Sequence, residues 1–349
     1  MGGILMRSRQ PGIDLLRCLG LLFVNGVHAF LYNGYYYEPQ MGFLIWGANS
    51  FKWLFFTCNG LFMLLTGYLK CEKPFSKSYY RSLLPILVGY GLTCLVSFPI
   101  RHFLQGEQKS LYQWFELAVT FGNYAWYIEM YIGLLLISPF INLALGQLKG
   151  PKQLYWAAGT MFVISALPSV TAINLIPDYW TSLYPVTYYV IGAVIRKLQP
   201  QLKSWISLTL GAVLAMCLGL FTLITTDSGA SDGFGQGYGG FWVTMIITFV
   251  FLGLYRVKIS EGAAKVLTWL SGGVFEGYIL SRLLDTWVYG LFPQWHSPEY
   301  YPLLFICVTV PIFIVSILSG KALHELAQWL CRPRPVKPGK FEVRETSVS

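Results

Sequence analysis

The sequence predicts an all-α, polytopic membrane protein with about ten transmembrane helices. Of its 349 residues, 55% are hydrophobic and only 12% are charged. This charged share is about half that of an ordinary soluble domain. Apolar stretches of about 20 residues, long enough to cross a bilayer as a helix, recur along the chain. A third observation, the distribution of the basic residues, predicts how these helices are oriented.

The apolar stretches define the predicted spans in chain order, with a short interfacial helix expected at 111–123, before the fourth span. The first stretch has no clear small-residue cleavage site, so we expect it to be retained as a span. Together the spans form one transmembrane domain, residues 1–320, followed by a basic, proline-rich tail at 321–349. The ten expected spans are 12–31, 49–69, 81–100, 124–145, 154–170, 183–196, 205–225, 239–255, 266–288 and 301–320.

The basic residues predict that both termini lie in the cytoplasm. With the N-terminus placed inside, the outer segments hold only four of the 25 lysines and arginines, namely Lys52, Arg101, Lys109 and Arg282. Such a bias sets the orientation of membrane proteins. It also accounts for the net charge of +9 without a nucleic-acid partner. The basic tail is expected to lie near anionic membrane lipids.

The cysteines and the short motifs exclude several other classes of protein. The seven cysteines are scattered, mostly inside apolar stretches, and form no CxxC pair. We interpret them as small packing residues and predict neither a metal site nor a disulfide framework. The sequence also lacks the phosphate-binding loop and the hydrolase and zinc-protease motifs.

The first span contains the most informative pair of residues, Arg17 and His28. Eleven residues of helix separate them by about 16 Å and return them to nearly the same face. Ionisable groups inside a span are expensive to bury and therefore indicate a functional site. His28 could take a proton from an attacking hydroxyl, or its ring could simply bond a neighbouring helix. Asn25, three residues earlier, could orient the ring or stabilise a developing oxyanion.

Basic residues near the inner surface could bind an anionic donor. Arg17 could contact phosphate through its planar guanidinium, or it could be a plain anchor, with Asp14 as a local partner. A further inner cluster could form a phosphate-binding mouth, or it could be an ordinary positive-inside loop. This cluster contains Lys70, Lys73, Lys77 and Arg81.

Acidic residues inside the spans must be paired, protonated or in contact with water. Glu129 in the fourth span could orient His28 or bind a sugar hydroxyl. In the ninth span Arg282 and Asp285 are expected to pair with each other, and Glu276 with a cation from another span. The remaining histidines are interpreted as surface, loop and tail residues, and they are His102, His296 and His324.

Aromatic residues of the outer loops have two interpretations. Tyr35 and Tyr36 in the first outer loop, and the glycine-rich loop 226–240, could be an aromatic belt and a flexible connector. They could instead form a rim that binds a sugar. The predicted substrate-binding residues are Tyr35, Tyr36, Trp126, Tyr127 and Tyr278.

Five segments, taken in order, resemble the membrane-bound acyltransferase family 3. The segment from Pro11 to Arg17, followed by His28-Ala29, resembles the opening of that family, which carries an arginine, ten residues and a histidine in its first span. Similar segments follow at 59–69, 126–139, 188–192 and 275–281. One such motif is weakly specific, whereas the ordered set covers nearly the whole chain.

The resemblance implies ten spans and the transfer of an acyl group, commonly acetyl, from acyl-CoA to a hydroxyl. The acceptor is expected to be a cell-envelope or exported carbohydrate, free or lipid-linked, and the protein a multi-pass protein of the cytoplasmic membrane. The family histidine corresponds to His28, as general base or transient acyl carrier, with Glu129 and Asn25 as further catalytic candidates. The residues expected to bind acyl-CoA are Arg17, Arg81, Lys77 and Lys73.

This chain departs from the family pattern at two positions, and the second departure implies that a ring is dispensable there or that substrate handling differs. Many members carry a second arginine near Arg81, and many carry a histidine where this chain has Ser281.

A transporter or flippase for a lipid-linked or polar substrate would share the helix bundle and its intramembrane charges. The absence of a visible inverted repeat and the basic inner mouth favour the enzyme. A regulatory membrane module without catalysis is a third alternative. The sequence does not specify the acceptor sugar, the acyl chain or the oligomeric state.

Overall fold

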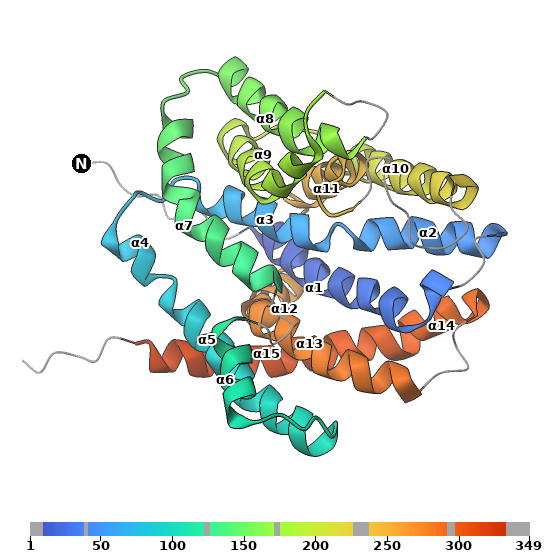
Figure 1. Cartoon of the computed structure of the whole chain (residues 1–349). Coiled ribbons are helices and arrows are strands. Elements are labelled where there is room, and N and C mark those ends of the chain that lie inside the picture. Colours follow the sequence, from blue (N-terminus) through green and yellow to red (C-terminus); the bar gives the residue numbers. More distant parts are fainter. Residues whose placement is uncertain are drawn as a thin grey trace, which may run out of the picture.

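The computed structural model describes residues 10–37, 41–121, 126–170, 175–225, 237–291 and 297–332. Within these residues the chain is helical and contains no strand, so the predicted all-α class is confirmed (Figure 1). The α-helices are α1 (Pro11–Tyr32), α2 (Phe43–Phe55), α3 (Cys58–Lys70), α4 (Lys77–Arg81), α5 (Leu84–Pro99), α6 (Leu111–Val119), α7 (Trp126–Gly146), α8 (Pro151–Ala166), α9 (Tyr184–Leu198), α10 (Ser204–Thr225), α11 (Phe241–Leu254), α12 (Glu261–Leu270), α13 (Val274–Val288), α14 (Tyr301–Leu304) and α15 (Val310–Leu330).

Short 3₁₀ and π segments extend or connect these helices. Among them, η2 (Ile100–Leu104) prolongs α5, η5 (Ser271–Gly273) joins α12 to α13, and η9 (Phe305–Thr309) joins α14 to α15. The remaining short segments are η1 (Tyr35–Tyr37), η3 (Leu167–Ser169), η4 (Asp178–Leu183), η6 (Tyr289–Leu291) and η8 (Pro298–Tyr300).

Five segments of the described chain are long and apolar enough to cross a membrane. They are α1, Lys77–Leu104, α7, α10 and Tyr301–Leu330. A helix overlaps each of the other expected spans. However, α8, α9, α11 and α13 are shorter than the roughly 20 residues that a helix needs to cross a bilayer. Ten spans and the cytoplasmic location of both termini therefore stay predictions. Figure 1 shows that α1 begins and α15 ends at the same end of the bundle, which we call the α1-start end.

The last helix is longer than the sequence predicted. We expected the tenth span to end at Gly320, whereas α15 continues to Leu330. Hydropathy falls in this stretch, but one face still packs on the protein, as the fully buried Ala327 shows. The glycine-rich segment 226–236 and the tail from 333 onward lie outside the described residues, so the predictions for them are untested.

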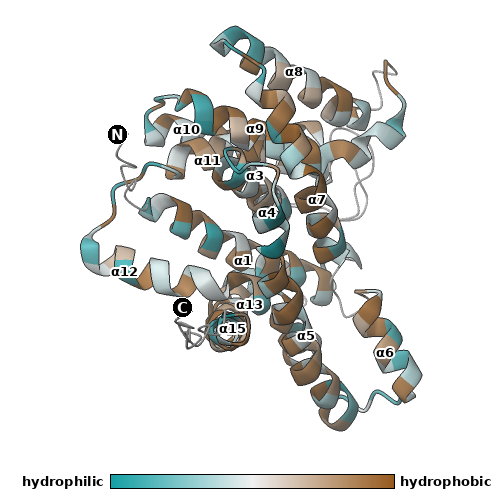
Figure 2. Cartoon of the chain, turned by 90° about the vertical axis from the view of Figure 1, so that its left-hand side faces the viewer, coloured by the Kyte–Doolittle hydropathy of each residue, from teal (hydrophilic) through white to brown (hydrophobic). Residues whose placement is uncertain are grey.

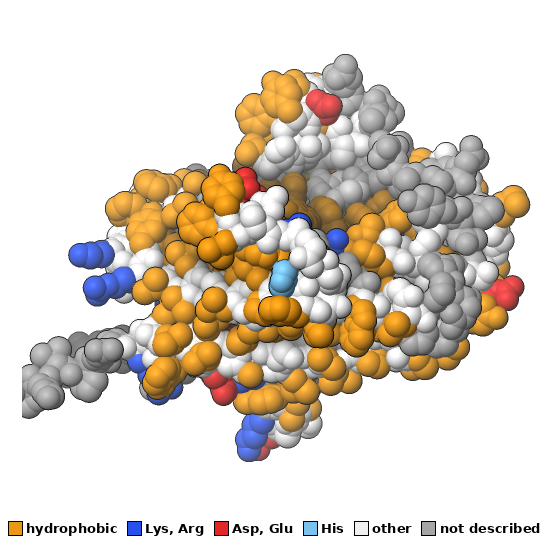
Figure 3. Space-filling model, turned by 60° about the horizontal axis from the view of Figure 1, so that its bottom comes forward, with side chains coloured by type: hydrophobic (Ala, Val, Ile, Leu, Met, Phe, Trp, Pro, Cys, Tyr) orange, Lys and Arg blue, Asp and Glu red, His pale blue; other side chains and the backbone are white. Residues whose placement is uncertain are grey.

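The surface has the apolar character of a membrane protein. On the face drawn in Figure 3, hydrophobic side chains cover most of the described surface, and lysines and arginines lie mainly toward its edges. Figure 2 looks onto the α1-start end and shows α1 among α3, α12, α13 and α15. The helix with the Arg17–His28 pair is thus an inner helix of the bundle, and 14 of its 22 residues are buried.

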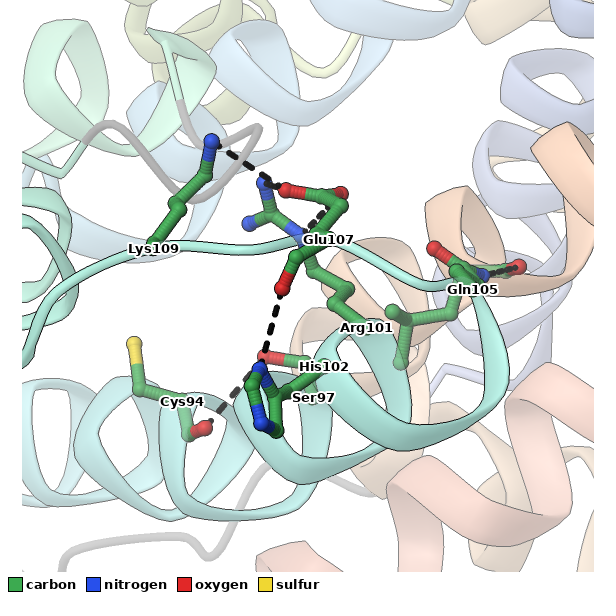
Figure 4. A network of polar contacts seen from close by, with 8 residues as sticks. Cys94, Ser97, Arg101, His102, Gln105, Glu107 and Lys109 are labelled. Atoms are coloured by element: carbon green, nitrogen blue, oxygen red, sulfur yellow. Dashed lines mark hydrogen bonds and ion pairs between the residues drawn. The ribbon is translucent and has the colours of Figure 1, made fainter.

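A polar network fixes the hairpin between α5 and α6 (Figure 4). The Arg101 guanidinium donates to both carboxylate oxygens of Glu107, each at 2.8 Å. Lys109 lies 3.3 Å from the same carboxylate, and Gln105 donates to the carbonyl of Leu283 on α13 at 3.0 Å. Bonding to Arg101 lowers the pKa of Glu107 below its ordinary value. The network therefore contributes stability at neutral pH, and this is lost as the pH falls through the lowered pKa.

Two glycines allow α3 and α9 to approach closely. A Cβ added at Gly67 would overlap the backbone carbonyl of Tyr189, and one added at Gly192 would overlap the carbonyl of Leu64. Small residues at such crossings are a common means of packing membrane helices. This contact holds the middle of the chain against α3, which lines the functional cavity described below.

We expect Gly192→Ala to destabilise the protein because the added methyl group pushes two backbones apart. Overpacking of this kind costs about 1–3 kcal/mol. Gly159→Ala on α8 is the matched control, since no heavy atom lies within 4 Å of a Cβ there. Thermal unfolding in detergent should show a lower midpoint for the first variant alone. Equal midpoints would show that α3 and α9 can separate freely.

Candidate active site

A histidine and an aspartate from two helices meet inside the bundle. The His28 ring on α1 bonds through Nδ1 to an Oδ atom of Asp285 on α13. The Asp285 side chain is fully buried, whereas His28 keeps 17% of its side chain exposed. The imidazole is therefore supported from its buried side by a carboxylate and remains accessible on the other side.

This pairing determines what the ring can do. With Nδ1 directed at a carboxylate, Nε2 is the nitrogen available to a reacting group. The carboxylate also stabilises the positive charge that the ring acquires when Nε2 takes a proton. A positioned histidine with a carboxylate behind it is the arrangement of a general base.

Several buried polar atoms near this pair have no hydrogen-bond partner among the described residues. Asn25 lies one turn before His28 and is fully buried. Within the described part of the chain, neither its amide nitrogen nor its amide oxygen has a hydrogen-bond partner, and the second carboxylate oxygen of Asp285 also has none. Buried polar groups are rarely left unsatisfied, so these atoms indicate a position where a ligand or water binds.

Aromatic rings and a guanidinium border His28. The Tyr32 ring lies edge-on to His28, with 6.1 Å between the ring centroids, and it stacks on Tyr289. The guanidinium carbon of Arg282 lies 4.5 Å from the centroid of the Tyr32 ring. This wall combines flat apolar surfaces with a cation, a combination that suits a polar acceptor with several hydroxyl groups.

A second feature, toward the α1-start end, is a basic cavity of about 660 Å³. Its wall contains residues of α1, α3, α7, α12, α13 and α15. Five of its lining residues can carry positive charge, and the wall includes no aspartate or glutamate among the described residues. These five are Arg17, Lys70, Lys73, Lys321 and His324. A cavity of this size and charge suits a ligand with phosphate groups.

Asp14 holds Arg17 at the wall of this basic cavity. The guanidinium lies 3.3 Å from the Asp14 carboxylate, and one third of the Arg17 side chain is exposed. Ser271 and Thr268 donate to the same carboxylate at 2.8 and 3.0 Å. The local pair predicted from the sequence is therefore present, and it also ties α1 to α12 and η5.

The basic cavity includes only part of the predicted donor-binding set. Arg17 and Lys73 line it. Lys77 and Arg81 are exposed on the short helix α4 and are not among its lining residues. Lys321 and His324 do line it, although the sequence placed both in the tail. That placement was wrong because α15 continues past Gly320.

The predicted substrate-binding tyrosines lie in different environments. Tyr127 and Tyr278 line the basic cavity, with 5.6 Å between their ring centroids. Tyr35 is fully buried and donates a hydrogen bond to Asn49, so it supports the fold rather than presenting an open surface. Tyr36 is half-buried, with the Lys52 ammonium 5.3 Å from its ring centroid. Trp126 is exposed, and its ring contacts the rings of Tyr127 and Tyr238.

Asp285 is the site residue that sequence reasoning missed. The carboxylate that contacts His28 is Asp285, not Glu129, which is exposed on α7. Spacing had assigned Asp285 to Arg282, three residues away. The sequence did contain a signal for this contact, because Asp285 and His28 are both ionisable residues inside spans and each needs a partner. Glu276 does pair with a residue of another helix, as predicted, and that residue is His324.

These features define a helical membrane protein with an imidazole–carboxylate pair inside the bundle and a basic cavity beside it. Residues 10–321 match the acyltransferase domain of acyltransferase family 3, which is nearly the whole chain. The chain belongs to this family and is an acyltransferase. No curated protein and no solved structure matches it.

We expect Asp285→Asn to reduce acyl transfer by about 10²-fold or more, because the amide keeps the shape but not the charge that supports the imidazolium. Asp178→Asn is the matched control, since Asp178 is exposed on η4. Initial rates of acyl transfer by protein in detergent would measure the effect. Rates that match the wild type would mean that Asp285 serves only to pack α13 against α1.

Proposed function

We propose that the protein is an integral-membrane O-acyltransferase that moves an acyl group, acetyl in the simplest case, from acyl-CoA to a carbohydrate hydroxyl. The observation that carries this proposal is the bond between His28 and the buried Asp285 inside a helix bundle. Family membership supplies the reaction class, and the paired imidazole supplies a base suited to a hydroxyl acceptor.

In the proposed reaction, the acceptor oxygen attacks the thioester carbonyl carbon while its proton passes to Nε2 of His28. Collapse of the tetrahedral intermediate breaks the carbon–sulfur bond. The imidazolium then returns the proton to the leaving thiolate, so that the products are an ester and free coenzyme A. Asp285 supports the positive charge between these two steps. The Asn25 amide, which has no hydrogen-bond partner among the described residues, is a candidate donor to the oxyanion.

The basic cavity would hold the donor. Arg17, Lys70 and Lys73 line it, and acyl-CoA carries several phosphate groups. Helix α1 connects the two features, because it carries Arg17 in the cavity wall and His28 about 16 Å further along. The nucleotide would therefore bind at the α1-start end, with the thioester directed toward His28.

The acceptor would approach from the opposite end of the bundle. Tyr32 borders His28 there, Tyr289 and Arg282 lie against the Tyr32 ring, and this wall suits a sugar. With the α1-start end in the cytoplasm, as the basic residues predict, the acceptor is a carbohydrate of the cell envelope or an exported one. This arrangement corresponds to a multi-pass protein of a bacterial cytoplasmic membrane. The transporter alternative gains no support from the family match.

The proposal is tested by release of free thiol from acetyl-CoA. Purified protein in detergent is incubated with acetyl-CoA and a crude cell-envelope glycan, and free coenzyme A is measured with a thiol reagent. Release that depends on both the protein and the glycan supports the reaction. No release with acetyl-CoA, other acyl-CoA donors and a range of glycans would overturn it.

We expect His28→Ala to lose acyl transfer by about 10² to 10⁴-fold, because a general base contributes that much to the rate. We expect the variant to fold because the bonds from Thr268 and Ser271 to Asp14 still hold α1, and thermal unfolding in detergent checks this. His102→Ala, on η2, is the control for loss of an imidazole. Undiminished thiol release by folded His28→Ala would exclude the mechanism.

We expect Arg17→Lys to raise the apparent KM for acetyl-CoA about tenfold with a smaller effect on kcat. Lysine keeps the charge but lacks the planar fork that binds phosphate through two bonds. Arg256→Lys is the control, because Arg256 is exposed at the end of α11 and does not line the basic cavity. An unchanged KM in Arg17→Lys would make Arg17 a plain anchor.

A further inference from the structure

The last helix adds two residues to the basic cavity that lie at the edge of the family match or beyond it. Lys321 is the last matched residue, and His324 lies three residues further along. Residues three apart share a helix face, and both of these line the cavity. They face η5, where a Cβ at Gly272 would lie 3.2 Å from the Lys321 ammonium and 3.6 Å from the His324 ring.

A buried carboxylate holds the His324 ring. Nδ1 of His324 lies 3.1 Å from Oε1 of Glu276, whose side chain is only 2% exposed. The other oxygen of Glu276 has no hydrogen-bond partner in the described part of the chain. A desolvated carboxylate strongly favours a positively charged neighbour. With Nδ1 so engaged, Nε2 is the nitrogen that can donate to a ligand in the basic cavity.

Lys321 is held more weakly and is available to a ligand. Its ammonium lies 3.0 Å from Glu325, a carboxylate that is 62% exposed, and 5.8 Å from the centroid of the Trp269 ring. Ion pairs with an exposed partner contribute little. A doubly charged phosphate can therefore replace Glu325 as the partner of Lys321 at small cost.

The orientation of the bound acyl-CoA in the basic cavity indicates which of its phosphate groups reaches Lys321 and His324. In the proposed reaction the thioester must approach His28, so the nucleotide occupies the part of the basic cavity near the α1-start end. Helix α15 ends at that same end (Figure 1). Of the phosphate groups of coenzyme A, the ribose 3′-phosphate is the most remote from the thioester along the molecule, and it carries two negative charges.

We infer that Lys321 and His324 form a subsite for the ribose 3′-phosphate of the donor, with Glu276 as the positioning residue for the His324 ring. The inference rests on the proposed function, in which acyl-CoA is the donor. On this inference, selectivity for a donor with the 3′-phosphate resides in the last turns of α15 and not in the wall around Arg17 on the other side of the basic cavity.

The test compares two donors that differ only in this phosphate. Acetyl-CoA and acetyl-3′-dephospho-CoA are assayed with wild type, His324→Gln and the double variant Lys321→Met/His324→Gln. We expect the KM for acetyl-CoA to rise about tenfold or more in the double variant, as loss of charge-assisted bonds implies. The KM for the dephospho donor should change less than twofold. Lys265→Met, an exposed charge removal on α12, is the control.

A binding measurement separates the subsite from the reaction. Adenosine 3′,5′-bisphosphate and adenosine 5′-monophosphate are compared by the shift they cause in thermal unfolding of the full chain. We expect the bisphosphate to stabilise the wild type more, and the double variant to lose this preference. Such a result would support the subsite even if no thiol release were found. Equal shifts in the wild type, or variants that lower kcat equally with both donors, would overturn it.

Discussion

The arrangement of this protein depends on the cost of placing ionisable groups on a helix inside an apolar bundle. A charged side chain at the centre of a membrane helix costs about 2.5–3.5 kcal/mol on insertion scales. Helix α1 carries Asp14 near one end and His28 toward the other, and another helical element satisfies each of them. Asp14 accepts bonds from Thr268 and Ser271, and His28 bonds Asp285. Two polar contacts at different depths therefore fix the register of α1 against the C-terminal helices.

This constraint also explains how one helix can serve two chemical environments. Around Arg17 the wall is basic, and around His28 it is aromatic with a buried carboxylate. Because α1 is continuous from Pro11 to Tyr32, the distance between the two is set by helix geometry and not by a loop. A donor bound at Arg17 can meet an acceptor at His28 only if its acyl-bearing arm spans that fixed distance.

The helices could be predicted from local properties of the sequence, whereas the contact partners of the site residues could be identified only from the fold. Apolar length and composition are local, so the helical class and the importance of Arg17 and His28 could be read directly. The partner of His28 lies 257 residues away, and spacing could indicate only the near neighbour Arg282 as a partner of Asp285. The last span was predicted to end at Gly320 because hydropathy falls after that residue. A helix with one packed face and one polar face is not apolar enough to be recognised as a span. Tyr35 was predicted to bind substrate because it lies in an outer loop of the sequence, whereas its hydroxyl donates to Asn49 of α2, a contact that only the fold creates.

Helix α13 carries both carboxylates that hold a histidine, and their spacing separates their roles. Glu276 and Asp285 are nine residues apart, so they lie about 13.5 Å apart along the axis and on opposite faces. Asp285 therefore faces α1 and Glu276 faces α15. The surroundings then differ: cations share the basic cavity with His324, whereas aromatic rings border His28. An anion in the basic cavity can therefore meet the ring that Glu276 positions, whereas the ring that Asp285 positions faces the aromatic wall.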